Sequence, residues 1–317
     1  MNVVILDSGY NSYSFEKNLF EENGFHLKIY PTYEGDKSEK IEFAKNAHGI
    51  LVRHTRIDEE FLMNMKNLKA VVRYGVGFDN VDVEACTHFG VKVANVQGYA
   101  NNAVSDHALA LMFACARALW NPKGQITGKF SAPPVADIFE LHDKTLGIIG
   151  LGRIGSVLAK KAAPLFKEII AADPYKSQKH CNRFSVRKVD LTELLETSDV
   201  ISIHCNLTKE THHILSEENF ALMKRKPVII NTSRGETVDE KALLEALKNG
   251  IIHSAGLDVY ENEPTNQNQD PLINHPRTIC TGHYAWYSDY AAIELQKRAA
   301  QNLYNFLTGK EVDDCLN

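Results

Sequence analysis

The sequence predicts an α/β protein of two doubly wound domains, each built on a parallel sheet, and three observations support this. At 317 residues, the chain is long enough for two domains of about 150 residues that each bury a core. Short apolar runs alternate with amphipathic stretches, as expected where crossover helices join parallel strands that are covered on both faces. The glycine-rich segment 150–155 follows one such apolar run and opens a helical pattern, which is the strand-to-helix turn of doubly wound folds.

The composition excludes several classes of protein. With 44% hydrophobic and 24% charged residues, the chain is typical of a folded globular protein. Its net charge is −5 and no basic run stands out, so we expect no nucleic-acid partner. The longest stretch without Asp, Glu, Lys or Arg, residues 93–105, is too short and too polar to cross a bilayer, so we expect no membrane partner.

The cysteines and the first residues bear on the compartment. Asp7 interrupts the first apolar run at a point where an export signal would still be apolar, and this predicts a cytoplasmic protein. The 6 cysteines show no Cys-x-x-Cys spacing, so we expect free thiols and no metal site.

The first part of the chain predicts five strands with intervening helices. The strands are expected at 3–6, 27–30, 49–52, 70–72 and 91–94, and the helices at 15–23, 37–46, 58–66 and 82–88. A longer helix, apolar enough to be buried on more than one side, begins near Asn101 and ends at Asn121-Pro122. Residues 123–140 show no period and predict an irregular segment.

A second series of strands follows, expected at 145–149, 168–173, 199–205, 228–233, 252–259 and 278–282. One of its helices shows both ends: Asp239 can accept the free N-terminal amides, and Gly250 supplies the stop after an apolar face of Leu243, Leu244 and Leu247. A last helix is expected from about Ser288 to Gly309. The chain therefore carries the material for two sheets.

The turn Gly150-Leu151-Gly152-Arg153-Ile154-Gly155 has the spacing of a dinucleotide fingerprint. Gly150 would allow the tight turn, Gly152 would let the backbone approach a pyrophosphate, and Gly155 would let helix and strand pack closely. The helix that follows would offer free amides to the phosphates. This predicts a dinucleotide site at the second sheet.

Asp173 ends the next strand, where an acid accepts hydrogen bonds from both ribose hydroxyls and repels a 2′-phosphate. The acid favours NAD over NADP. Lys176 and Lys179 lie just downstream, and either they weaken this preference or they belong to a solvated loop.

Three polar residues follow strands of the second series, at the edge where open α/β sheets bind ligands. Arg234 suits a carboxylate, which a guanidinium holds through two parallel hydrogen bonds. His283 is a proton donor and acceptor near neutral pH, and Glu263 would orient it and favour its charged form. Together they are the set needed to reduce a 2-oxo acid with hydride.

At these residues the sequence resembles the D-isomer-specific 2-hydroxyacid dehydrogenase family. The matching segments are RYGVGFDNVDVEAC, SDHALALMFACAR, KTLGIIGLGRIG, NTSRGETVDEKAL, GLDVYENEP and GHYAWYSDYA. The resemblance implies a flavodoxin-like substrate-binding domain formed by residues 1–99 and 285–317, with a Rossmann NAD-binding domain, residues 100–284, inserted in it. It also implies a homodimer formed through the NAD-binding domain.

The resemblance implies NAD-dependent interconversion of a 2-oxo acid and a D-2-hydroxy acid. Hydride passes between NADH and C2, His283 exchanges the proton, Glu263 orients His283, and Arg234 binds the substrate carboxylate and carbonyl. The residues implied to bind the cofactor are Gly150, Gly152, Arg153, Ile154, Gly155, Asp173, His204, Cys205, Asn206, Thr232, Ser233, Asp258 and Ser105. Those implied to bind substrate are Arg53, Arg73, Gly75, Val76, Gly77 and Trp286.

Some positions leave the substrate open. Gly282 stands where the family usually has proline before the histidine, and His204-Cys205-Asn206 departs from a His-x-Pro run. The segment around Trp286 resembles that of the C-terminal binding protein corepressors, in which a tryptophan lines the substrate pocket. Trp286 could instead pack at the hinge between the domains. Arg53 resembles the arginine that phosphoglycerate dehydrogenases use for a phosphate, but it could also be a solvated charge in a loop.

Two functions therefore remain. The first is an active dehydrogenase, with phosphoglycerate dehydrogenase and hydroxypyruvate or glyoxylate reductase as possible activities. The alternative is a dinucleotide-sensing interaction protein, similar to the corepressors, with vestigial dehydrogenase activity. Arg234, Glu263 and His283 are all present, and this favours the enzyme.

Overall fold

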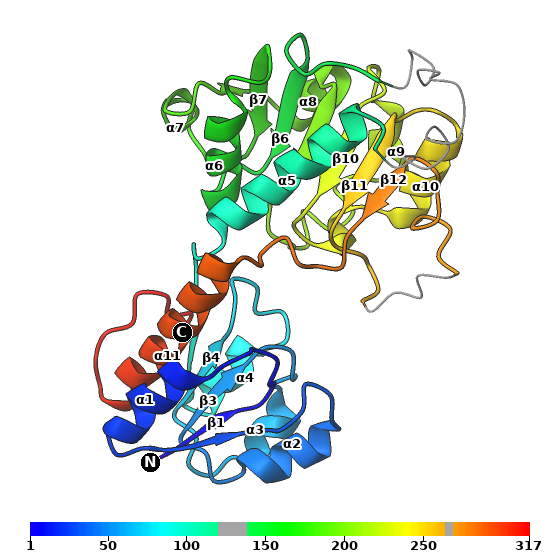
Figure 1. Cartoon of the computed structure of the whole chain (residues 1–317). Coiled ribbons are helices and arrows are strands. Elements are labelled where there is room, and N and C mark those ends of the chain that lie inside the picture. The colour runs from blue at the N-terminus through cyan, green and yellow to red at the C-terminus, as the bar shows by residue number, and fades with distance from the viewer. Residues whose placement is uncertain (120–137, 264–268) are drawn as a thin grey trace. The chain divides into compact units, whose positions relative to one another are not determined.

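The computed structural model describes residues 1–119, 138–263 and 269–317. These residues form two compact units (Figure 1). Unit 1 comprises Met1–Ala100 and Ser288–Asn317, and unit 2 comprises Asn101–Tyr287. The sequence placed the two boundaries after residues 99 and 284, whereas the units divide after residues 100 and 287.

Unit 1 has a five-stranded sheet in the order β2-β1-β3-β4-β5, with every pair parallel. This is the flavodoxin-like strand order that the family resemblance implies. The strands are β1 (Asn2–Ile5), β2 (His26–Ile29), β3 (Gly49–Val52), β4 (Ala70–Arg73) and β5 (Lys92–Ala94). The helices are α1 (Ser14–Glu22), α2 (Lys37–Ala44), α3 (Glu59–Met63), α4 (Val83–His88) and α11 (Asp289–Leu307).

The two faces of this sheet are covered by different helices because side chains alternate along each strand. Val4, Ile50 and Val71 pack in one cluster with residues of α2, α3 and α4. On the other face, α11 packs against β3 and β4 and lies beside α1. A Cβ on Gly49 would come within 2.9 Å of Leu303 of α11, so the glycine lets this helix approach the strand closely.

Unit 2 has a seven-stranded parallel sheet in the order β12-β11-β10-β9-β6-β7-β8. The direction of winding reverses between β6 and β9, which is the switch point of a Rossmann fold, and the prediction of two doubly wound sheets is confirmed. The strands are β6 (Thr145–Ile149), β7 (Glu168–Ala172), β8 (Arg187–Lys188), β9 (Val200–Ile203), β10 (Val228–Asn231), β11 (Ser254–Leu257) and β12 (Thr278–Cys280). The helices are α5 (Asn101–Ala116), α6 (Arg153–Ala162), α7 (Gln178–Asn182), α8 (Leu191–Thr197), α9 (Glu217–Ala221) and α10 (Glu240–Lys248), with a 3-10 helix at Gly235–Thr237.

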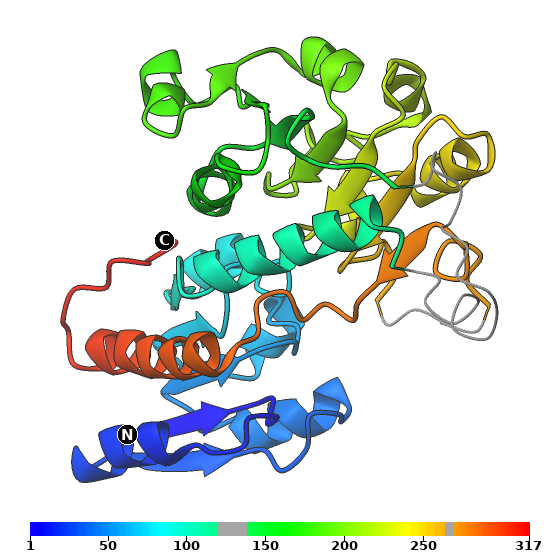
Figure 2. The same cartoon turned by 45° about the horizontal axis from the view of Figure 1, so that its top comes forward.

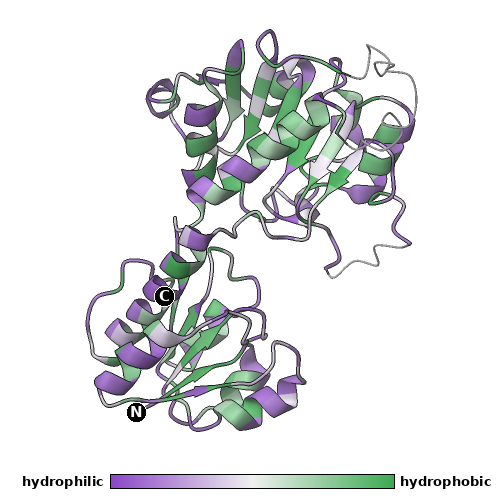
Figure 3. Cartoon of the chain, in the orientation of Figure 1, coloured by the Kyte–Doolittle hydropathy of each residue, from purple (hydrophilic) through white to green (hydrophobic). Residues whose placement is uncertain are grey.

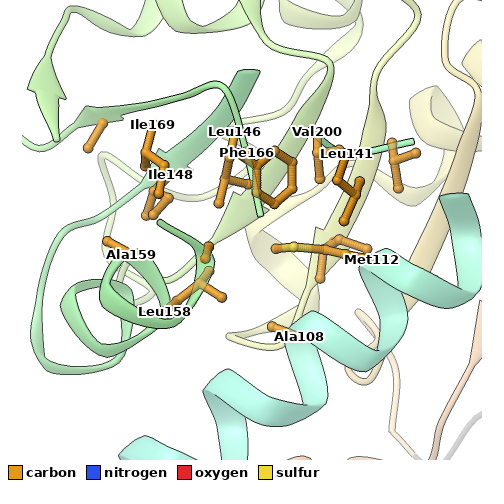
Figure 4. Close-up of a cluster of buried hydrophobic side chains, with 14 of the residues drawn as sticks. Ala108, Met112, Leu141, Leu146, Ile148, Leu158, Ala159, Phe166, Ile169 and Val200 are labelled. Carbon is orange, nitrogen blue, oxygen red and sulfur yellow. The ribbon is translucent and has the colours of Figure 1, made fainter. Parts of the chain in front are cut away.

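The long helix α5 is buried against this sheet (Figure 2). Ala108 and Met112 pack with Leu146 and Ile148 of β6 and Val200 of β9, in a cluster that also holds residues of α6 (Figure 4). In Figure 3 the strands of this sheet are largely green, which marks them as apolar, and α5 carries green segments along its length. The end of the helix predicted at Asn121-Pro122, and most of the irregular segment 123–140, lie outside the described residues.

The predicted ends of α10 are confirmed. The Asp239 carboxylate accepts hydrogen bonds from the backbone N–H groups of Lys241 and Ala242, both at 3.0 Å. Gly250 has φ +66°, the left-handed conformation that ends helices. Such a cap contributes about 1 kcal/mol to helix stability.

Two properties of residues 1–119, 138–263 and 269–317 bear on membranes and metals. None of their helices is long and apolar enough to cross a membrane. Their His, Cys, Asp and Glu side chains form no group of three or more that could hold a metal ion. The six cysteines are free thiols, as predicted.

A buried carboxylate joins two strand ends of unit 1. Asp7, after β1, is fully buried and accepts hydrogen bonds from the backbone N–H groups of Arg53, His54 and Thr55, which follow β3. Lys40 Nζ lies 2.8 Å from Asp7 Oδ1, and its side chain is 7% exposed. Burial alone would raise the pKa of Asp7, but these hydrogen bonds lower it to about 2. The carboxylate is therefore charged and fixes the segment that carries Arg53.

We expect Lys40→Met to lower the free energy of unfolding of unit 1 by about 3–5 kcal/mol, because it leaves the buried Asp7 carboxylate without its countercharge. Denaturant unfolding measures the effect. Lys45→Met is the matched control, since Lys45 and its partner Glu42 are exposed and such pairs contribute less than about 1 kcal/mol. Equal loss of stability in both variants would contradict the role assigned to the Asp7–Lys40 pair.

Candidate functional site

The glycine turn of unit 2 has a separate physical requirement at each glycine. Gly150 follows β6 with φ +91°, and a Cβ there would lie 2.6 Å from the backbone nitrogen of Cys205. A Cβ on Gly155, in the first turns of α6, would lie 2.2 Å from the carbonyl oxygen of Gly150. A Cβ on Gly152 would meet no protein atom within 4 Å. The turn and the helix packing thus need two of the glycines, and the third borders open space.

The surroundings of this turn fit a dinucleotide. Gly152 is the N-cap of α6, so the backbone N–H groups of Arg153 and Ile154 lie in its first turn, where helices bind phosphates. His204, after β9, and Thr232, after β10, each have a buried side-chain atom without a hydrogen-bond partner among the described residues, Nδ1 and Oγ1 respectively. Burial lowers the pKa of His204 to about 4, so its ring is neutral. Unpartnered polar atoms after β9 and β10, at the edge of the sheet that carries the glycine turn, are available to a polar ligand.

Asp173 follows β7 and is tied to the glycine turn. Its Oδ2 accepts a hydrogen bond from the Leu151 backbone N–H at 2.9 Å, and its Oδ1 accepts one from Tyr175 at 2.9 Å. An ionised carboxylate has about four lone-pair sites, so Asp173 can still accept from ribose hydroxyls.

The other residues predicted to bind the cofactor lie in several local environments. The Ser105 hydroxyl is buried, donates to the Asn102 carbonyl and accepts from Lys161 Nζ of α6. The Ser233 hydroxyl bonds to Asn231 Oδ1 at 2.9 Å. Cys205 and Asn206 continue from His204 in the loop after β9. The structure therefore brings the turn, Asp173, His204 and Cys205 together, while Ser105 and Ser233 have protein partners.

Two of the three predicted catalytic residues are hydrogen-bonded to each other. His283 Nδ1 lies 2.5 Å from Glu263 Oε2, and the other carboxylate oxygen of Glu263 accepts from the Tyr260 backbone N–H at 2.9 Å. The side chain of His283 is 44% exposed and that of Glu263 is 33% exposed. Because Nδ1 bonds to the carboxylate, Nε2 is the nitrogen left for a reacting group.

The charge of Glu263 is stabilised by its neighbours. Burial would raise the pKa of this carboxyl, but the hydrogen bond and charge of His283, the Tyr260 backbone N–H and the charge of Arg234 together hold the pKa below its usual value. Glu263 is therefore a carboxylate at neutral pH, the form that accepts a hydrogen bond from His283 Nδ1.

Arg234 is placed by the backbone beside it. It is the N-cap of the 3-10 helix, and its Nη1 donates to the Ser233 carbonyl at 2.7 Å. A Cβ on the next residue, Gly235, would lie 1.9 Å from the carbonyl carbon of Tyr260. The absence of a side chain at Gly235 brings the segment carrying Arg234 against the segment carrying Glu263.

Asp258 is buried and binds the loop that carries His283. Its carboxylate accepts from the Thr281 hydroxyl at 2.6 Å and from the backbone N–H groups of Tyr284 and Ala285 at 3.1 and 2.8 Å. Its carbonyl accepts from the His283 N–H at 2.8 Å. The family resemblance places this acid near the nicotinamide amide, and within unit 2 it also holds the histidine loop.

The residues predicted to bind substrate in unit 1 follow β3 and β4. The Arg53 guanidinium lies 4.8 Å from the Tyr10 ring centre and 5.6 Å from that of Tyr33, within the range of cation–π contacts. Arg73 ends β4, and a Cβ on Gly75, which has φ +138°, would lie 1.7 Å from Arg73 Nη1.

Three other predicted residues contribute differently. Val76 is 39% exposed and follows Gly75 in the same loop as Gly77. Trp286, in unit 2, packs edge-on against Tyr287 with ring centres 5.5 Å apart. Binding of substrate at all these positions stays a prediction.

Sequence reasoning missed three residues that support the site. The Tyr260 hydroxyl donates a hydrogen bond to the Thr281 carbonyl at 2.9 Å. The Thr281 hydroxyl is also hydrogen-bonded to His107 of α5, with Oγ1 2.9 Å from Nε2. His107 belongs to the segment SDHALALMFACAR, but a histidine in an apolar helix gives no sign of a partner so far along the chain. Only the packing of α5 against β11 and β12 reveals the contact.

Comparison with known proteins identifies the family of this chain. A family model described as the NAD binding domain of D-isomer specific 2-hydroxyacid dehydrogenases matches residues 109–285. A D-3-phosphoglycerate dehydrogenase of Archaeoglobus fulgidus is 36% identical over 302 residues, 95% of this chain but 56% of the relative, so the chain spans little more than half its length. A glyoxylate reductase of Korarchaeum cryptofilum is 36% identical over 303 residues, 93% of this chain and 91% of the relative.

A solved structure is similar over almost the whole chain. The D-lactate dehydrogenase of Aquifex aeolicus, complexed with NAD and lactic acid, has a TM-score of 0.85 at 28% identity and covers 98% of this chain and 96% of its own.

The Rossmann sheet and its glycine turn, together with the family model that matches this part of the chain, define an NAD-binding domain. The chain belongs to the D-isomer specific 2-hydroxyacid dehydrogenase family.

The glycines give a matched pair of variants. We expect Gly152→Ala to leave the melting temperature unchanged, since its methyl group meets no protein atom, but to raise the Kd for NADH roughly tenfold or more because the methyl group occupies the approach to the phosphates. Gly155→Ala should lower both the melting temperature and NADH affinity. NADH fluorescence titration and thermal unfolding measure the two effects. Wild-type NADH affinity in Gly152→Ala would contradict this placement of the phosphates.

Proposed function

We propose that this protein is an NAD-dependent dehydrogenase that interconverts a 2-oxo acid and the corresponding D-2-hydroxy acid. The observation that carries the proposal is the 2.5 Å hydrogen bond between His283 Nδ1 and Glu263 Oε2, next to Arg234 and on the sheet that bears the dinucleotide turn. Family membership supports the same reaction.

His283 is the residue that donates and accepts the proton of the reaction. In the direction of reduction, Nε2–H donates its proton to the carbonyl oxygen as that oxygen becomes a hydroxyl, and in oxidation neutral Nε2 accepts the proton back. Glu263 accepts the Nδ1–H hydrogen bond throughout, which fixes the ring and stabilises the imidazolium. The carboxylate itself stays ionised, in line with its lowered pKa.

Arg234 is the residue that binds the charged carboxylate of the substrate. Its planar guanidinium can bind the substrate carboxylate and polarise the adjacent carbonyl, which stabilises negative charge on the oxygen before the proton arrives. When bound, NADH supplies the hydride to C2. The reaction balances as 2-oxo acid, NADH and one proton giving 2-hydroxy acid and NAD⁺.

The identity of the acid is open between several classes. The relatives include a phosphoglycerate dehydrogenase, a glyoxylate reductase and a D-lactate dehydrogenase. Oxidation of NADH with hydroxypyruvate, glyoxylate, phosphohydroxypyruvate, phenylpyruvate and 4-methylthio-2-oxobutyrate tests the proposal. No turnover with any of them would overturn it in favour of a dinucleotide-sensing interaction protein.

Further parts of the proposal concern the remaining residues and the state of the protein. Substrate contacts are assigned to Arg53, Arg73, Gly75, Val76, Gly77 and Trp286, and nicotinamide contacts to Asp258. The protein is proposed to be a cytoplasmic homodimer that associates through unit 2. Light scattering on the purified protein tests the dimer, and a monomeric mass would contradict it.

Replacement of His283 should remove the proton donor. Asparagine is the suitable substitute because it tolerates the positive φ of this residue, +54°, so the backbone is kept. We expect His283→Asn to lower kcat by roughly 10²–10⁴-fold with the Kd for NADH unchanged. Wild-type turnover in this variant would exclude His283 as the acid, and His142→Asn, an exposed histidine of the same unit, serves as control.

Replacement of Glu263 should change the pH dependence. The pKa of this carboxyl is held below its usual value, so the hydrogen bond to His283 should persist until the pH falls into the range where Glu263 takes up a proton. Glutamine does not titrate, so we expect Glu263→Gln to lower kcat roughly 10-fold or more and to abolish this acidic limb of the pH profile. An unchanged acidic limb would contradict the pairing, and the exposed Glu245→Gln is the control.

A further inference from the structure

His283 has an unusual backbone conformation for its role. Its φ is +54°, a region that few residues other than glycine adopt and that is stable only when the surroundings impose it. Gly282, which precedes it, imposes no such restriction. Contacts elsewhere in unit 2 must therefore hold the loop.

The first of these contacts is Asp258. It binds His283 through its carbonyl and the residues on both sides of His283 through its carboxylate, on one side Thr281 and on the other Tyr284 and Ala285. A single buried group thus fixes the loop from its start to its end. The direction of the His283 ring depends on where this group and Thr281 are held.

The second contact comes from α5. His107 Nε2 lies 2.9 Å from Thr281 Oγ1, and the His107 and Tyr284 rings pack edge to face with centres 5.4 Å apart. His107 therefore contacts both residues that flank the Gly282-His283 pair. Because α5 packs against α6, β10, β11 and β12, it is a rigid support for these contacts.

The hydrogen-bond pattern fixes the direction of this contact. The Thr281 hydroxyl has one hydrogen, and its shortest acceptor is Asp258 Oδ1 at 2.6 Å. Toward His107 the hydroxyl can then only accept, so His107 Nε2 carries a hydrogen and donates. His107, Thr281 and Asp258 form an ordered chain of donors that ends at a carboxylate.

We propose that His107 is a positioning residue for the dehydrogenase reaction, acting through Thr281 and Asp258 to hold His283 in the orientation that bonds to Glu263. The kinetic consequences of this proposal rest on the proposed function, but the effect of His107 on the position of the His283 ring does not. His107 does not touch the reacting atoms. Its loss should therefore lower kcat and leave NADH binding intact.

Two substitutions separate the donor from the ring. His107→Phe keeps an aromatic ring against Tyr284 but removes the N–H, whereas His107→Gln keeps an N–H donor at a similar reach. We expect His107→Phe to lower kcat by roughly 10- to 100-fold, the effect of displacing a reacting group by about 1 Å, with the KM for NADH within about twofold of wild type. His107→Gln should restore most of the lost kcat. His142→Phe is the control for adding a phenyl ring at an exposed site of the same unit.

Thr281→Val tests the route of the effect because it removes the hydroxyl and keeps the shape of the side chain. If His107 acts through Thr281, the double variant His107→Phe/Thr281→Val loses no more activity than the more impaired single variant. Additive losses would overturn the proposed route. An unchanged kcat in His107→Phe, or equal impairment in His107→Gln and His107→Phe, would overturn the positioning role. If His107→Phe does not fold, Thr281→Val decides the matter, because a wild-type kcat in this variant would overturn the proposed route to His283.

A readout without turnover distinguishes this proposal from the proposed function. The imidazole C–H resonances of His283, assigned by their loss in His283→Asn, should shift in His107→Phe and in Thr281→Val and return toward wild type in His107→Gln. Unshifted resonances would overturn the proposal even in an active enzyme. A wild-type protein that reduces no 2-oxo acid but shows these shifts would contradict the proposed function alone.

Discussion

Parallel pairing of the strands is the constraint on which the rest of this structure depends. In a parallel sheet every strand ends at the same edge, so residues separated in sequence by whole crossover connections meet there. The glycine turn after β6, Asp173 after β7, His204 after β9 and Asp258 after β11 all come to one edge of unit 2 for this reason. In unit 1 the same geometry brings Asp7, after β1, to the segment after β3 that it binds.

Side-chain size at this edge then decides what each segment can do. Where a Cβ would collide with backbone, as at Gly150, Gly155 and Gly235, glycine brings two segments into contact and the fold needs it. At Gly152 the Cβ position is open, so folding does not require glycine there. Gly152 lies in a turn whose other two glycines are required by the fold. A bound phosphate is therefore the best explanation for a glycine at this position.

The sequence was sufficient for the elements with strong local signals. Apolar runs identified both sheets, and Asp239 and Gly250 marked the ends of α10, because these signals lie within a few residues of each other. It was insufficient for β8, since Arg187–Lys188 is short and polar and becomes a strand only by pairing with β7. The contact of His107 with Thr281 was also beyond it, because a hydrogen bond across such a separation depends on how α5 packs, not on any local pattern.

The His283–Glu263 pair is partly exposed, and its geometry depends on buried groups nearby. His283 and Glu263 are partly exposed, so neither is fixed by packing, and a short hydrogen bond between exposed groups holds its geometry only if both backbones are fixed. Tyr260 meets this need on one side, since its N–H binds Glu263 and its hydroxyl binds the Thr281 carbonyl. Asp258, buried and bonded to the loop, meets it on the other. His283 and Glu263 thus stay partly exposed, while Asp258 and Tyr260, which hold their backbones, are buried.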